Sequence, residues 1–588
     1  MTRPPYDLFP FVAVSGPASA CVAGWDAIAE RLRARIARHD AVRTVLVVEC
    51  YHGVDEAGIL TELAQRLRPA LSIAADESLL STAEIDALVG PVLGDDPVFG
   101  LMNDLQLSQF FQAGRLAAAR QRIEATPAGL VLVVGCGARL IGEGDVLVYA
   151  DLSRREAQLR QRRGEIANLG ALNHTASPGS KYKRAFYVDW RACDRHKRPL
   201  IPRWDFVLDT HDPRAPKLVE GDAVRRGLRE TARRPFRVVP YFDPAPWGGQ
   251  WLREQFQLDA AARNFGWGFD CVPEENSLLL GFGPHRVELP ALDLVFDQPE
   301  ALLGADVYRR FGAEFPIRFD FLDTVDGGHL SFQVHPLKDY IRRTFGMAYT
   351  QDESYYLLAT KPGACVYLGL REGVERQAML RALADAQSGG PPFPAEDFAN
   401  VWLTKPHDHF LIPAGTVHCS GRDCVVLEIS ATPYNFTFKL WDWGRPGLDG
   451  RPRPVHLDHG EKNIQWDRNT PWVRQNLINR IEPLSSGEHW REERTGLHEL
   501  EFIETRRHWF TGPTPHDTAG NLNVLNLVQG HSAVVESPTD AFAPFTVHYA
   551  ETFIVPAAVG RYTVRPLGSN ASTPSATLKA FVRPDTNR

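Results

Sequence analysis

The sequence predicts a multidomain protein in which an α/β domain with a mostly parallel sheet precedes a long all-β region. At 588 residues the chain is too long for one hydrophobic core, and about three domains are expected. Up to residue 232, apolar runs such as Thr44 to Val48 alternate with amphipathic stretches such as Ala27 to Ile36, as in a parallel sheet flanked by helices. Beyond Val238 short β-type runs are separated by Gly, Pro, Asp and Asn, which is typical of antiparallel sandwiches and barrels.

The pattern of apolar and turn-forming residues changes along the chain and predicts three domains. These are an α/β domain at 1–232, a first β domain at 233–455 and a second β domain at 456–588. The helix-like segment Gly373 to Ser388 is expected as a small helical insertion. The last β-rich segment, from about Leu497 to Pro566, is a candidate second copy of the preceding β domain.

Composition excludes several classes of protein. Charged residues make up 23% and hydrophobic residues 44% of the chain, as in ordinary globular proteins, and the net charge of −7 offers no general attraction to nucleic acid. The eight cysteines include no CxxC pair, which fits free thiols in a reducing compartment. The sequence shows neither a signal peptide nor an apolar stretch of about 18 residues, so we expect a cytoplasmic protein that contacts neither membrane nor nucleic acid.

Four polar residues in the first β domain have the spacing of a metal site. Gln333 and His335 are two residues apart, so on a strand both project from one face. Glu353 opens the next apolar run, and His418 follows the turn formed by Pro413 and Gly415. Imidazole, carboxylate and amide oxygen together suit zinc, with manganese or iron as alternatives.

Three phrases of the sequence carry a family resemblance. They are LSFQVHP, DESYYLLATKPGACVYLGL and HFLIPAGTVHCSGRDCVVLEIS, the last of which contains the pattern PxGxxH. Together they resemble the zinc-binding core of the type I mannose-6-phosphate isomerases, which belong to the cupin superfamily. The resemblance covers roughly residues 244–566 and implies a double cupin, an antiparallel barrel or jelly roll. The C-terminal copy has Tyr562 and no histidine at the matching turn, so we expect it to lack metal.

The resemblance also implies roles for individual residues. Such enzymes interconvert mannose 6-phosphate and fructose 6-phosphate by moving a proton between C1 and C2 of the sugar. The matching positions are Gln333, His335, Glu353 and His418 as zinc ligands, Glu428 and Lys439 as catalytic residues, and Ser331 and Lys338 at the substrate phosphate. The chain departs from the family at Lys439, where a catalytic arginine is expected, and a flexible lysine does not replace the fixed fork of arginine.

The first domain faintly resembles nucleoside and nucleotide kinases. Its loop from Ser15 to Gly24 lacks the lysine and the hydroxyl of GxxxxGK[ST], so ATP hydrolysis by a standard P-loop is not expected. Two later basic segments resemble a kinase core with its lid, and they could meet an anionic ligand such as a nucleotide. Their cations are Arg154, Arg155, Arg160, Arg162, Arg163, Lys181, Lys183, Arg184, Arg195, Lys197 and Arg198.

Three functional hypotheses follow. The leading one is a metal-dependent sugar-phosphate isomerase preceded by a degenerate kinase-like domain. The second is a metal-cupin sensor that binds a sugar phosphate without converting it, which Lys439 in place of arginine favours. The third is a bifunctional kinase and isomerase.

Overall fold

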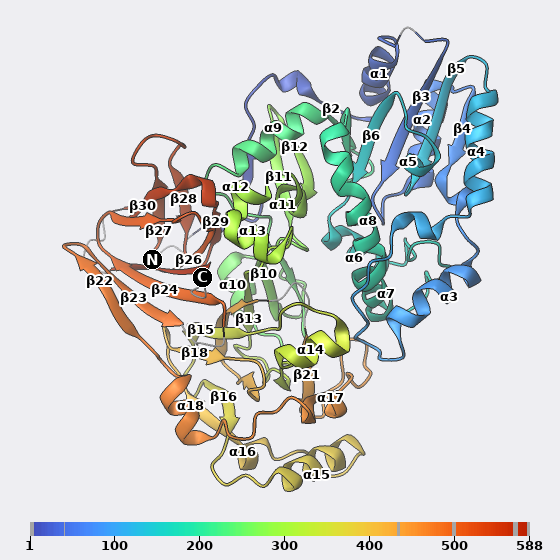
Figure 1. Ribbon diagram of the computed structural model, residues 1–588. Coiled ribbons are helices and arrows are strands. Elements are labelled where there is room, and N and C mark those ends of the chain that lie inside the picture. The colour runs from blue at the N-terminus through green and yellow to red at the C-terminus, as the bar shows by residue number, and fades with distance from the viewer. Residues whose placement is uncertain (1–4, 40, 432–435, 497–500, 569–573, 585–588) are drawn as a thin grey trace. The chain divides into compact units, whose positions relative to one another are not determined.

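The computed structural model describes residues 5–39, 41–431, 436–496, 501–568 and 574–584. The chain forms two compact units that interleave in sequence (Figure 1). The α/β unit comprises Phe11–Thr231 and Glu275–Gln298, and the β unit comprises Met1–Pro10, Ala232–Glu274 and Pro299–Arg588. Among the described residues, none of the helices combines the length and apolar character that crossing a bilayer requires. All eight cysteines are buried and free.

A seven-stranded sheet forms the centre of the α/β unit. From edge to edge its strands are β2 (Cys21–Ala23), β8 (Lys217–Glu220), β7 (Phe206–Asp209), β6 (Val146–Asp151), β3 (Arg43–Cys50), β5 (Gly129–Gly135) and β4 (Leu71–Ala74). The five strands from β7 to β4 are parallel, as expected, while β8 and β2 are antiparallel. Leu46, Val47 and Val48 are fully buried, which explains why the central strand is continuously apolar.

Helices lie between and after the strands of this unit. They are α1 (Trp25–Ile36), α2 (Glu56–Leu67), α3 (Thr82–Leu93), α4 (Ala113–Ala125), α5 (Ala138–Ile141), α6 (Arg154–Arg162), α7 (Pro178–Arg184), α8 (Trp190–Lys197), α9 (Gly221–Thr231) and α11 (Leu292–Asp297). Polar side chains start several of them: Ser81 and Glu84 form a capping box at α3, and the Asp55 carboxylate accepts a hydrogen bond from the Gly58 N–H at α2.

Residues 275–298 return to the α/β unit after the chain has entered the β unit. In this segment β11 (Ser277–Phe282) pairs with β12 (His285–Pro290) and, in parallel, with β1 (Phe11–Ala13). The two compact units of the structure have other boundaries than the three predicted domains, 1–232, 233–455 and 456–588. The division into three domains therefore stays a prediction. Pairing between strands more than 260 residues apart leaves no local signal in the sequence.

The first part of the β unit consists of two antiparallel sheets. One contains β18 (His409–Ile412), β15 (Glu353–Thr360), β20 (Cys424–Ser430), β13 (Arg318–Asp323), β10 (Trp267–Cys271) and β9 (Tyr241–Asp243) in that order. The other contains β17 (Ala399–Leu403), β16 (Cys365–Leu370), β19 (His418–Ser420), β14 (Phe332–Val334) and β21 (Phe438–Trp441). The predicted helical insertion is α15 (Arg376–Gln387).

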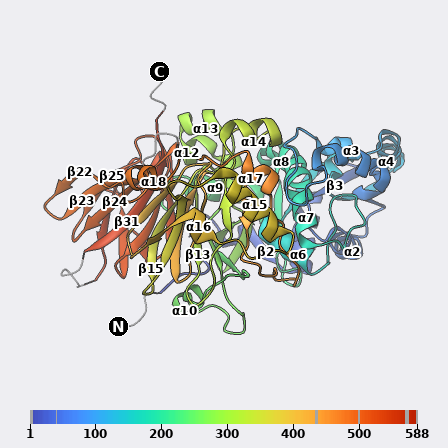
Figure 2. The ribbon, with the colours of Figure 1, turned by 90° about the horizontal axis from the view of Figure 1, so that it is seen from below.

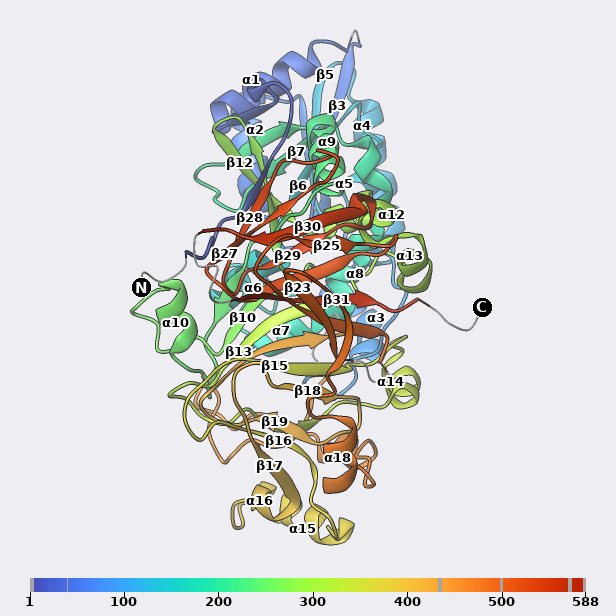
Figure 3. The same cartoon turned by 90° about the vertical axis from the view of Figure 1, so that its left-hand side faces the viewer.

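A second pair of antiparallel sheets follows in the same unit (Figures 2 and 3). One contains β22 (Glu482–Gly487), β23 (Trp490–Gly496), β24 (Ile503–Phe510), β31 (Ser575–Val582), β26 (Asn523–Gln529) and β29 (Thr552–Val555). The other contains β25 (Thr514–Asp517), β30 (Arg561–Pro566), β27 (Ser532–Glu536) and β28 (Phe545–His548). Leu525 and Phe553 from the first sheet and Val535 and Val564 from the second share one buried core.

The helices of the β unit are short. They are α10 (Trp251–Phe256), α12 (Pro299–Leu303), α13 (Ala305–Phe311), α14 (Lys338–Phe345), α15, α16 (Ala395–Phe398), α17 (Leu457–Glu461) and α18 (Thr470–Asn476). Two successive pairs of antiparallel sheets agree with the expected all-β region and its small helical insertions, and their assignment as a double cupin stays a prediction.

Candidate metal centre

Three side chains from both sheets of the first pair meet in the interior of the β unit. His335 directly follows β14, Glu353 opens β15 and His418 opens β19. One ligand atom from each lies within 4.8 Å of the others, and all three residues are buried. They form the one group of this kind among the described residues. Because their strands belong to two different sheets, the fold and not the local chain brings them together.

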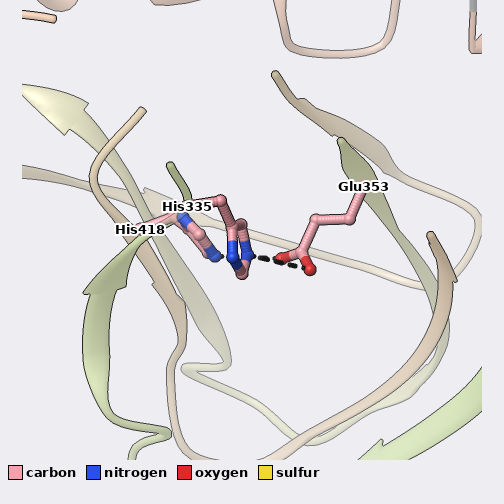
Figure 4. Close-up of side chains that lie close together, drawn as sticks. All are labelled: His335, Glu353 and His418. Atoms are coloured by element: carbon pink, nitrogen blue, oxygen red, sulfur yellow. Dashed lines mark ion pairs between the residues drawn. The ribbon is translucent and has the colours of Figure 1, made fainter. Parts of the chain in front are cut away.

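The Glu353 carboxylate faces both imidazoles (Figure 4). Its Oε2 lies 3.0 Å from His335 Nε2, and its Oε1 lies 2.9 Å from His418 Nε2. Burial disfavours the charged forms of all three groups. At His335 and Glu353 the opposite charges outweigh burial, whereas at His418 burial lowers the pKa in spite of Glu353. The pKa of His335 is therefore raised by Glu353, and the two imidazoles hold the pKa of Glu353 well below its usual range. Glu353 is accordingly ionised, as a metal ligand must be.

Backbone carbonyls determine which nitrogen of each ring faces the centre. His335 Nδ1 lies 2.8 Å from the Phe436 oxygen, and His418 Nδ1 lies 2.9 Å from the Thr416 oxygen. Since a carbonyl only accepts, each Nδ1 carries the proton and each Nε2 presents a lone pair to the carboxylate. His335 Nε2 and Glu353 Oε1 make no hydrogen bond of regular geometry. A cation between these lone pairs would satisfy them, so the residues fit a metal ion.

Gln333 completes the predicted set. It is buried and lies opposite His418 in the pairing of β14 with β19. Its amide nitrogen lies 3.2 Å from His418 Nε2, and turning the amide by half a rotation brings its oxygen to the same place. The structure therefore brings all four predicted ligands together, with donor types that suit zinc.

Glu428 on β20 is buried beside this group. It lies opposite Tyr355 of β15 and Asp320 of β13. Burial and the neighbouring carboxylates of Asp320 and Glu353 raise its pKa well above the usual range, against the opposing charge of Arg318. A carboxyl group with a raised pKa thus adjoins the candidate ligands.

Lys439 on β21 lies opposite Gln333 and is half-buried. No hydrogen bond or ion pair joins its ammonium group to any described residue. Burial and then Arg453 lower its pKa to about 8, while Asp442 has the opposite effect. This lone cation beside the centre favours an anionic ligand.

The two predicted phosphate residues have different surroundings. The Ser331 hydroxyl donates to Asp442 Oδ1 at 2.9 Å and is buried. Lys338 is exposed at the start of α14, and no hydrogen bond joins it to the other predicted site residues, all of which the structure describes. Only Ser331 is therefore placed among the polar residues beside Lys439.

Two arginines that the sequence did not single out lie next to Ser331. Arg453 donates to the Ser331 hydroxyl at 3.2 Å and pairs with Asp442 at 3.1 Å, while Arg445 pairs with Asp442 at 2.7 Å. Both lie in the irregular segment after β21, where no motif or periodicity singled them out. The region around Lys439 is thus more basic than the predicted site residues indicated.

The loop that resembled a phosphate loop is not at the centre of the parallel sheet. Ser15 to Gly24 contains β2, which is an antiparallel edge strand. The central strand β3 instead leads into α2, where Asp55 caps the helix and Glu56 accepts from the Cys136 N–H at 3.0 Å. Carboxylates thus occupy the helix N-terminus that would attract a phosphate.

The basic segments of the α/β unit are largely engaged in internal contacts. Arg154 pairs with Asp194 at 2.6 Å, and Arg160 pairs with Glu156 at 3.0 Å. Lys197 is buried between Asp151, at 2.5 Å, and Asp293. These pairs weaken the interpretation of the cations as a lid for an anionic ligand.

The fold and its buried side chains define the β unit as an antiparallel β protein with a candidate metal centre between two of its sheets. The probable mannose-6-phosphate isomerase GmuF of Bacillus subtilis (strain 168) is 26% identical over 227 residues, 38% of this chain and 66% of that protein. The mannose-6-phosphate isomerase of Streptococcus mutans is 26% identical over 217 residues, 36% of this chain and 62% of that protein. The chain thus spans slightly less than two thirds of each curated relative. The predicted resemblance to the mannose-6-phosphate isomerases is confirmed.

Solved structures and a family model complete the comparisons. The mannose 6-phosphate isomerase from Bacillus subtilis has a TM-score of 0.47 at 17% identity, covering 59% of this chain and 99% of that one. A zinc-bound mannose 6-phosphate isomerase has a TM-score of 0.45 at 15% identity, covering 60% and 100%. Residues 24–233 match a family described as "Domain of unknown function (DUF8485)". The resemblance of this region to kinases stays a prediction.

Proposed function

We propose that the β unit is a metal-dependent aldose–ketose isomerase acting on a sugar phosphate, with mannose 6-phosphate and fructose 6-phosphate as the preferred pair. The observation that carries the proposal is the buried group of His335, Glu353 and His418, in which both Nε2 atoms face the carboxylate. The relatives named mannose-6-phosphate isomerase support the same reaction class.

The residues around the centre suit this chemistry. A zinc ion held by Gln333, His335, Glu353 and His418 would polarise the sugar oxygens, with manganese or iron as alternatives. The raised pKa of Glu428 makes its carboxylate a stronger base, which suits a group that takes a proton from one sugar carbon and returns it to the next.

The cations near the centre support an anionic substrate. Lys439 has no ion-pair partner among the described residues, and Arg453 shares Asp442 with Arg445. Two guanidinium groups on one carboxylate leave positive charge for a phosphate. Ser331, bound by both Asp442 and Arg453, lies within this group.

Metal analysis of the wild type and of His418→Ala tests the proposal. We expect about one equivalent of zinc in the wild type and at least a tenfold loss in the variant, because one of the strong ligands is removed. His409→Ala is the matched control, since His409 is also buried but its ring lies outside the ligand group. A zinc content unchanged by His418→Ala refutes the ligand assignment.

A coupled assay with mannose 6-phosphate then separates the alternatives. Turnover that is lost in His418→Ala and kept in His409→Ala supports the isomerase. Binding of sugar phosphates without turnover, across a panel of hexose and heptose phosphates, favours the sensor. If calorimetry detects no ATP binding, both the bifunctional kinase and a nucleotide ligand are excluded. The carboxylates of Asp55 and Glu56 at the start of α2 already disfavour a bound phosphate.

A further inference from the structure

A second pocket lies in the β unit, at one end of its C-terminal pair of sheets. It has a volume of about 560 Å³, which is within the range of sites for small organic ligands. Helix α13, the turn Thr518–Asn521 and strands β24 and β31 contribute to its walls. None of the residues predicted for the metal centre lines it.

The inner wall of this pocket is charged although it continues an apolar core. Lys579 lies opposite both Arg506 and Leu525 in the sheet, and Leu525 belongs to the buried core between the two sheets. Residues that face each other across paired strands project to the same side, so Lys579 and Arg506 point inward. The fold therefore places two cations at the end of a hydrophobic interior.

Carboxylates only partly neutralise these cations. The nearest carboxylate oxygen to the Lys579 ammonium is Glu492 Oε1 at 3.9 Å, beyond hydrogen-bond range. The same oxygen is shared with Arg506 at 3.1 Å and His508 at 3.2 Å. Arg506 also pairs with Glu504 at 2.6 Å, so Lys579 is the less compensated of the two cations. The side chain of Lys579 is nevertheless only 7% exposed, and burial lowers its pKa to about 8. An anion bound in the pocket would stabilise a buried ammonium with so little compensation.

The opposite wall adds a cation and hydrogen-bonding groups. The Arg310 guanidinium of α13 lies 5.0 Å from the ring centres of Phe311 and Phe502, and no carboxylate among the described residues pairs with it. Asp517 and Asn523 also line the pocket and carry acceptor oxygens. Such acceptors suit the hydroxyl groups of a ligand.

We propose that this pocket is a second binding site, for a phosphorylated sugar whose phosphate is met by Lys579 and Arg310 and whose hydroxyls are met by Asp517 and Asn523. The volume exceeds what inorganic phosphate alone would fill. The proposal does not rest on the function proposed for the metal centre.

Calorimetric titration with fructose 6-phosphate in a His418→Ala/Lys439→Met background tests this site, because that double variant removes both a metal ligand and the unpaired cation of the first centre. We expect one binding event, weakened at least about tenfold by Lys579→Met and by Arg310→Ala, since each removes a charge-assisted hydrogen bond. Lys462→Met is the matched control, because Lys462 is exposed and does not line the pocket. Arg310 is itself exposed, so its variant decides the question even if Lys579→Met fails to fold.

Two further ligands identify what is recognised. Fructose, which lacks the phosphate, should bind at least about tenfold more weakly than fructose 6-phosphate, and inorganic phosphate should also bind more weakly. Equal binding of inorganic phosphate overturns the sugar part of the proposal. Absence of binding, or binding unchanged by both Lys579→Met and Arg310→Ala, overturns the site. In the otherwise wild-type protein Lys579→Met should leave mannose 6-phosphate turnover unchanged, so failure here is distinct from failure at the metal centre.

Discussion

At the scale of single residues, hydrogen bonds to the backbone give the candidate metal centre its chemistry. Sequence spacing predicted that Gln333 and His335 share a face, and the structure brings both to His418. Spacing could not predict that the Phe436 and Thr416 carbonyls accept from the two Nδ1 atoms. Those contacts determine the tautomer of each ring, and therefore whether its Nε2 is available to a metal.

Lys439 provides the residue-scale prediction. Lys439→Met should lower kcat/KM for mannose 6-phosphate at least about tenfold without changing the zinc content, because it removes the cation predicted to be catalytic and no metal ligand. Steady-state kinetics with parallel metal analysis measure both effects. Lys439→Arg is the matched control, since it keeps the charge and should retain substrate binding.

Two outcomes would contradict that assignment. An unchanged kcat/KM in Lys439→Met shows that Lys439 is not the catalytic cation, and Arg453 then becomes the next candidate because it reaches Ser331. Turnover that appears only in Lys439→Arg indicates that the natural protein is a sensor.

At the scale of elements, the turn before β19 positions His418. Gly415 has a φ of +90°, and its N–H donates to the His335 oxygen at 3.0 Å. A Cβ atom at this position would lie 2.7 Å from Gln465, 2.8 Å from Leu337 and 2.9 Å from the Asn463 oxygen. The turn therefore links two candidate ligands and tolerates no side chain. The sequence pattern PxGxxH predicted the turn, but not the neighbours that fill the space around it.

Gly415→Ala should therefore reduce zinc content and lower the unfolding temperature. Gly363→Ala is the matched control, because Gly363 has a φ of +86° and a Cβ atom added there would meet no other atom within 4 Å. The control carries only the backbone cost of about 1–2 kcal/mol. Equal zinc content in the two variants, measured by mass spectrometry of the metal, would show that the turn does not position His418.

At the scale of the whole molecule, the chain closes its α/β unit with a distant segment. Residues 275–298 supply the strand partner of β1, the Glu288 N–H that donates to Asp209 at 2.9 Å, and the Asp293 carboxylate at Lys197. A chain cut after residue 231 lacks these contacts and leaves the buried Lys197 with Asp151 alone.

Residues 11–231 alone should consequently melt at a lower temperature than the same residues joined to 275–298 by a flexible linker. Thermal unfolding followed by circular dichroism measures the difference, and a scrambled 275–298 sequence on the same linker serves as the control. If the three proteins unfold at one temperature, the returning segment contributes nothing to the unit.

The sequence by itself determined the local features of this protein: apolar runs for the parallel strands, short β runs for the antiparallel sheets, and the spacing of Gln333, His335, Glu353 and His418. These features depend on residues close together in the chain, so apolar periodicity and turn-forming residues predict them without knowledge of the fold. Only the tertiary structure decided which distant groups meet, such as Arg453 with Ser331, Asp293 with Lys197, and Lys579 with the shared carboxylate of Glu492. Such pairs arise from strand order and sheet packing, which local sequence does not encode.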